Sequence, residues 1–108
     1  MTFDDYQKAA LRTANLGQKN ELFHLVLGLV GESGEIAEKI KKWVRDQASD
    51  ETKIDIDDLT KELGDVLWYA AVLSQYFEVN FNDVAARNIA KLADRQKRGA
   101  IKGSGDNR

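Results

Sequence analysis

The sequence predicts an all-α protein with a four-helix bundle-like architecture. Proline is absent from its 108 residues, and apolar residues recur at three- and four-residue steps along most of the chain. The stretches between these amphipathic segments are short, and short connections make consecutive helices antiparallel neighbours. A chain of this length is most simply a single domain over 1–108, with an expected radius of gyration of about 13 Å.

Each of the four helices has its own signal. The first begins within the acidic, amphipathic N-terminal segment. The second carries leucines and isoleucines at helical spacing from Leu22 to Ile40. Asp55, Asp57 and Asp58 favour the first turn of the third helix, and Asn80 or Asn82 caps the fourth. The glycine-containing segment 99–108 is predicted to be an irregular, basic C-terminal tail. The predicted helices are 3–15, 20–47, 56–77 and 82–98.

Composition excludes several classes of protein. No apolar run approaches the roughly 20 residues of a membrane span, and the N-terminus does not resemble a signal peptide, so a cytoplasmic location is expected. The absence of cysteine removes disulfides and thiolate metal sites, and a single histidine excludes a histidine cluster within the chain. Any bound metal would therefore be held by oxygen ligands.

Charge is distributed unevenly along the chain. Residues 1–86 carry nine Lys or Arg against sixteen Asp or Glu, whereas residues 87–108 carry seven against two. This pattern fits a site in which a metal neutralises carboxylates and a cationic end of the molecule meets phosphate. A solvated helix followed by a polar tail would give the same pattern.

Two acidic pairs interrupt or border the apolar stripes of the second and third helices. Glu32 and Glu35 are three residues apart, as are Glu62 and Asp65. Antiparallel packing could bring the pairs together, and four converging carboxylates would repel one another without a cation. Mg²⁺, with Mn²⁺ as a substitute, suits such a site and usually completes its shell with water and phosphate. The alternative is that these glutamates are simply solvated.

Glycine is frequent beside these pairs. Gly28, Gly31 and Gly34 lie at three-residue steps in the second helix, and Gly64 separates Glu62 from Asp65. Each glycine costs helix stability, so close approach to the backbone is expected. The approaching group is either a neighbouring helix or a hydrated metal with a phosphate chain.

These motifs resemble those of the MazG-like all-α nucleoside triphosphate pyrophosphohydrolases. "GLVGESGEIAEKI" and "ELGDVLWYAAVL" are similar to the ExxE and ExxD segments of that family, and the similarity extends over about residues 20–108. The resemblance implies Mg²⁺-dependent hydrolysis of (deoxy)nucleoside triphosphates to the monophosphate and pyrophosphate, in nucleotide pool cleansing or control. It also implies four metal ligands, which are Glu32, Glu35, Glu62 and Asp65.

The sequence leaves parts of this chemistry open. Many members have two adjacent glutamates where this chain has Gly31 and Glu32, which leaves the number of metal ions undecided. A carboxylate must accept the proton of the attacking water, and Glu35 and Glu38 are the candidates. The closest rival reading is a phosphoribosyl-ATP pyrophosphohydrolase. A non-catalytic helical module with an acidic face is the alternative outside enzymes, whereas nucleic acid binding is disfavoured by the net charge of −2.

Substrate contacts are predicted on the fourth helix and the tail. Lys91 and Arg95, one turn apart, are expected to grip the phosphate chain, with Asn88 one turn earlier; an exposed basic face is the alternative. Lys102 and Arg108 are expected to close over phosphates or base. Trp43 is a candidate stacking surface for the base.

Self-association is also expected. The second helix would span roughly 40 Å at about 1.5 Å per residue, more than a small domain needs for its own core. It should expose apolar surface that another copy covers, and closed homo-oligomers are the usual solution. A homotetramer built from dimers is predicted, with a dimer as the second choice. The candidate surface residues are Leu22, Val26, Val44 and Phe77.

Overall fold

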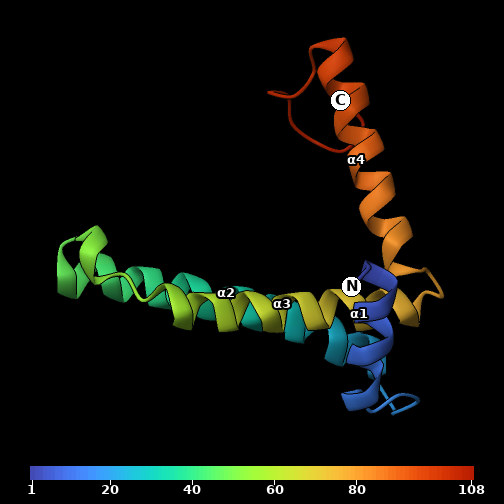
Figure 1. Ribbon diagram of the computed structural model, residues 1–108, viewed down its shortest axis with the longest axis horizontal. Coiled ribbons are helices and arrows are strands. Elements are labelled where there is room, and N and C mark those ends of the chain that lie inside the picture. The colour runs from blue at the N-terminus through green and yellow to red at the C-terminus, as the bar shows by residue number, and fades with distance from the viewer.

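The structure is a computed structural model that describes residues 1–108, and it contains four α-helices and no strand (Figure 1). The all-α class and the four predicted helices are confirmed. None of the helices combines the length and apolar character that crossing a lipid bilayer requires. In chain order the elements are α1 (Phe3–Ala10), the 3₁₀ helix η1 (Leu11–Thr13), α2 (Glu21–Gln47), the 3₁₀ helix η2 (Glu51–Lys53), α3 (Ile56–Tyr76) and α4 (Phe81–Arg98).

Helix α1 is shorter than the predicted 3–15. Thr2 and Asp5 form a capping box at its start, and the chain tightens into η1 after Ala10. Trp68 of α3 donates its indole N–H to the carbonyl of Ala10 at 3.2 Å and to the hydroxyl of Thr13 at 2.9 Å. These long-range hydrogen bonds give the acceptor groups at the end of α1 a donor from outside the helix. The α-helical hydrogen-bond ladder therefore does not need to continue.

Helices α2 and α3 form a long antiparallel hairpin (Figure 1). A Cβ atom at Gly28 would lie only 2.1 Å from the ring of Tyr69, so the absence of a side chain allows the two helices to approach closely. The connection is fixed by Trp43, whose indole N–H donates to the carbonyl of Asp50 at 2.8 Å. Asp55 then caps α3 by accepting from the backbone N–H of Asp58.

The buried core lies where α1 crosses the hairpin and α4 begins. The carboxamide of the buried Gln7 donates to the carbonyls of Ala71 and Val79 and accepts from the backbone N–H of Phe81. Because one side chain satisfies three backbone groups, it fixes the corner between α3 and α4. The buried hydrophobic residues are Ala10, Leu25, Ala71, Val72 and Phe81.

Helix α4 projects away from the hairpin, so the four helices do not close into a bundle within one chain (Figure 1). The radius of gyration is 16.8 Å, well above the expected value of about 13 Å. Contacts made by Gln7 and the reciprocal hydrogen bonds between Asp4 and Asn82 hold only the first turn of α4. Beyond that turn, α4 leaves apolar side chains such as Ile89 exposed.

Candidate functional site

Three carboxylates gather where α2 and α3 cross. Glu32 of α2 and Glu62 and Asp65 of α3 each offer an oxygen atom, and these atoms lie within 4.8 Å of one another. The close contact of Gly28 with Tyr69 lies one helical turn away, since Gly28 precedes Glu32 by four residues and Tyr69 follows Asp65 by four. The packing of the hairpin therefore sets the distance between the carboxylates. We call these three residues the acidic trio.

An open pocket of about 420 Å³ lies over part of the acidic trio. Its polar and aromatic walls include the indole of Trp68, which is held by η1, and the ring of Tyr69. A pocket of this size accommodates a hydrated cation together with a small anionic group. The lining residues are Thr13, Glu32, Asp65, Trp68 and Tyr69.

The repulsion among the carboxylates of the trio affects the pKa of Glu32. Partial burial raises the pKa of its carboxyl group, and the charges of Asp65, Glu62 and Glu35 raise it further. Glu32 makes no ion pair with a basic side chain. The ionised form is therefore disfavoured in the protein and would be stabilised by a cation.

We expect Glu32→Gln to stabilise the metal-free protein at neutral pH. Because the folded-state pKa of Glu32 lies above its ordinary value of 4.5, its contribution favours folding when protonated and is lost as pH rises through the folded pKa. The variant and the wild type should therefore be equally stable below about pH 4 and diverge above it. Urea unfolding in EDTA across this range measures the difference. Glu51→Gln, at an exposed glutamate outside the trio, is the matched control, and equal behaviour of the two variants would contradict the expectation.

Lys39 is a member of this site that the sequence reasoning missed. Its ammonium group pairs with Asp58 and, at 3.1 Å, with Glu62. Hydrogen bonds to these two carboxylates raise the pKa of Lys39. The sequence feature that indicates this role is the position of Lys39 on the side of α2 that faces α3, four residues before Trp43 and three after Ile36. Lys39 offsets part of the charge on Glu62 and leaves Glu32 and Asp65 without a counter-charge.

Glu35 and Glu38 of α2, the two candidates for proton transfer, lie outside the trio. Glu35 is exposed and is not part of the cluster of three. Glu38 pairs with Lys41 at 3.1 Å, and this hydrogen bond and charge lower its pKa. The structure thus brings together three of the four predicted metal ligands.

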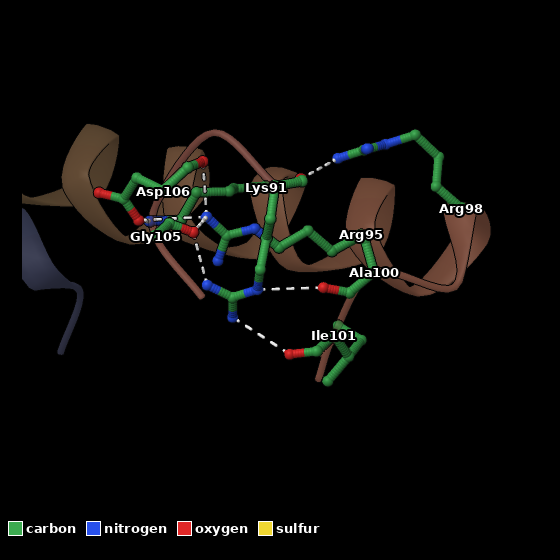
Figure 2. Close-up of polar contacts among 8 residues, drawn as sticks. Lys91, Arg95, Arg98, Ala100, Ile101, Gly105 and Asp106 are labelled. Carbon is green, nitrogen blue, oxygen red and sulfur yellow. Dashed lines mark hydrogen bonds and ion pairs between the residues drawn. The ribbon is translucent and has the colours of Figure 1, made fainter. Parts of the chain in front are cut away.

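Two basic residues of α4, Lys91 and Arg95, face the C-terminal tail (Figure 2). Lys91 and Arg95 both contact the carboxylate of Asp106, at 2.9 and 3.1 Å. These cations form no ion pair with the acidic trio of the same chain, and α4 as a whole projects from the hairpin (Figure 1). Asn88 and Lys91 instead line a groove of about 520 Å³ between α3 and α4, with Leu29 of α2.

The other predicted substrate residues have local surroundings. Lys102 is exposed. Arg108 donates to the carbonyls of Ala100, Ile101 and Gly105 and so ties the tail to itself. Trp43 is half-buried in a pocket of about 340 Å³ at the loop end of the hairpin, which it shares with Lys39.

Comparison with known proteins places this geometry in a family. The sequence model of the protein family described as the MazG nucleotide pyrophosphohydrolase domain matches residues 18–100. Gene 37 protein of Mycobacterium phage L5 is 46% identical over an alignment of 114 positions that covers both chains completely. No solved structure matches this chain. Because the matched range contains the whole hairpin, the acidic trio and α4, the chain belongs to the MazG nucleotide pyrophosphohydrolase family.

Proposed function

We propose that the protein hydrolyses (deoxy)nucleoside triphosphates to the monophosphate and pyrophosphate in a Mg²⁺-dependent reaction, with Mn²⁺ as a substitute ion. The observation that carries this proposal is the acidic trio, with three oxygen atoms within 4.8 Å of one another on a MazG hairpin. We place the reaction in nucleotide pool cleansing or control, as a family membership of this kind suggests.

The donor set fits a small divalent cation. Three carboxylates face one lysine, so the cluster and Lys39 together have an excess of negative charge. Mg²⁺ prefers oxygen ligands in octahedral geometry, and three protein oxygens leave positions for water and phosphate. When bound, such an ion neutralises phosphate oxygens and lowers the pKa of a coordinated water.

The chain's own carboxylates supply proton transfer in this proposal. Glu35 lies one turn after Glu32, is close enough to raise the pKa of Glu32, and has no basic partner. Glu38, the other candidate, is already paired with Lys41. We therefore favour Glu35 as the acceptor of the water proton, either as an outer metal ligand or free of the metal.

The substrate residues require a second copy of the chain to reach the trio. Lys91, Arg95 and Asn88 lie on α4, which extends away from the carboxylates of its own hairpin. We propose that a neighbouring copy presents its α4 and tail, including Lys102 and Arg108, to the trio, and that Trp43 stacks on the base. The assembly proposed is a homotetramer built from dimers, with the dimer as the second choice.

An apolar stripe on α2 supports self-association. Phe23, Leu27 and Val30 recur at four- and three-residue steps and are 66%, 68% and 64% exposed. Val44 continues the same spacing at the other end of the helix. Leu25, on the opposite side of α2, is buried toward α3 and the core. Of the four surface residues predicted from sequence, Val26, Val44 and Phe77 are exposed and Leu22 is half-buried.

A substrate screen tests the proposed activity. Purified protein is incubated with each nucleoside and deoxynucleoside triphosphate and with phosphoribosyl-ATP, and pyrophosphate release is measured with Mg²⁺ and with EDTA. We expect release from at least one nucleoside triphosphate only when the metal is present. Release from phosphoribosyl-ATP alone would move the protein to the rival activity, and the absence of release from every compound would refute hydrolysis.

A further inference from the structure

The C-terminal tail folds back along α4. Gly99 adopts a left-handed conformation with φ of 71°, and the backbone N–H of Ala100 donates to the carbonyl of Arg95 at 2.7 Å. Arg108 then donates to three carbonyls of the tail, as described above. This path returns Asp106 to the side of α4 that carries Lys91 and Arg95 (Figure 2).

Asp106 occupies the place that a phosphate oxygen would take between these cations. Its Oδ1 atom accepts hydrogen bonds from Lys91 at 2.9 Å and from Arg95 at 3.1 Å. Lys91 first, and then Arg95, lower the pKa of Asp106, so this carboxyl group is ionised at neutral pH. A single carboxylate oxygen atom of Asp106 therefore bridges the ammonium group of Lys91 and the guanidinium group of Arg95.

The carboxylate is exchangeable even though the tail is well anchored. The side chain of Asp106 is 80% exposed, whereas those of Lys91 and Arg95 are 38% and 4% exposed, so the carboxylate is the partner that solution anions can replace. Arg95 does not depend on this carboxylate alone, because its guanidinium also donates to the backbone carbonyls of Asp106 at 2.7 Å and Gly105 at 3.4 Å. An incoming anion can thus replace the carboxylate while Arg95 remains in position.

The cation pair borders a space for the rest of a ligand. Lys91 lines the groove of about 520 Å³ between α3 and α4, together with Arg87 and Asn88. Apolar side chains of Leu29 and Phe77 form other walls. A phosphate group on Lys91 would therefore lie at the edge of a partly apolar groove with further polar groups beside it.

We propose that Asp106 is an internal competitor for phosphate, which closes the Lys91–Arg95 cation pair in the free protein and releases it to a phosphate-bearing ligand. The inference rests on the proposed function for the choice of a phosphate ligand and adds a regulatory element to that site. A phosphate-bearing ligand that binds this cation pair must therefore displace the carboxylate of Asp106.

Pyrophosphate binding to the full-length protein tests the proposal. Calorimetry at low salt in EDTA is used, since without a divalent ion the α4 cations are probed separately from the acidic trio. Asp106→Asn is expected to bind pyrophosphate about threefold to tenfold more tightly than the wild type, which corresponds to the loss of its two ion pairs, with Lys91 and Arg95. Asp94→Asn is the matched control, because Asp94 pairs with Arg98 at 2.8 Å and its replacement changes the net charge equally. Lys91→Met should bind most weakly.

Circular dichroism establishes that each variant keeps its helices. Equal affinities of the Asp106 and Asp94 variants, weaker binding by Asp106→Asn, or no binding by any of the proteins would each overturn the proposal. A protein that hydrolyses no triphosphate but binds pyrophosphate more tightly as Asp106→Asn would refute the proposed function and leave the competitor in place.

Discussion

Asp65→Asn is expected to lower the rate of nucleoside triphosphate hydrolysis by about a hundredfold or more, because it removes a carboxylate from the proposed metal site without changing side-chain volume. Asp65 is exposed and has no basic partner, so the helix should not depend on its charge. Pyrophosphate release at saturating Mg²⁺ measures the rate. Circular dichroism should show an unchanged helical content.

Matched variants separate a lost ligand from a general loss of negative charge. Asp57→Asn alters an exposed carboxylate in the first turn of the same helix and should leave the rate close to that of the wild type. Glu62→Gln should resemble Asp65→Asn in activity, but it also removes one of the two ion-pair partners of Lys39. Wild-type activity in Asp65→Asn would contradict the assignment of the acidic trio to the metal.

Leu27→Glu is expected to dissociate the assembly into a 12.1 kDa species and to abolish most of the activity. Leu27 is at the centre of the exposed stripe on α2, and a carboxylate buried between two copies without a partner would cost several kcal/mol. Activity should fall with assembly because α4, which carries the proposed substrate cations, projects away from the hairpin of its own chain. Light scattering and activity are measured on the same samples.

The control for this variant adds the same charge to a polar surface. Gln75→Glu changes an exposed residue of α3 and should keep both the assembly and the activity. A wild-type protein that scatters as a fully active monomer at micromolar concentration would contradict self-association and the shared site together.

Sequence periodicity located the four helices, although it extended α1 beyond its observed end at Ala10, and it did not predict their arrangement. The predicted ends of α2, α3 and α4 differ from the observed ends by no more than one residue, because 3.6-residue spacing and capping residues are local signals. The direction of α4 depends on Gln7, whose hydrogen bonds reach residues 64 to 74 positions away. No local pattern identifies such a contact.

The contacts of the charged residues likewise could be predicted from sequence only in part. The spacing of Glu32, Glu62 and Asp65 indicated a shared site, because carboxylates beside apolar stripes are costly on adjacent helices. Lys39 was overlooked because a lysine on a highly charged helix is usually solvated, and only the packing of α2 against α3 shows its partners. Lys91 and Arg95 were identified from their sequence, whereas their contact with Asp106 depends on the return path of the tail.

The missing side chain at Gly28 has a consequence for the choice of metal ion. A methyl group there would push against the ring of Tyr69 and separate α2 from α3 one turn from Glu32 and Asp65. Mg²⁺ takes oxygen ligands at about 2.0–2.1 Å and Ca²⁺ at about 2.3–2.6 Å, so a widening of a few tenths of an ångström distinguishes the two ions. In the proposed site, discrimination between ions of different radius therefore depends on a residue that offers no ligand atom.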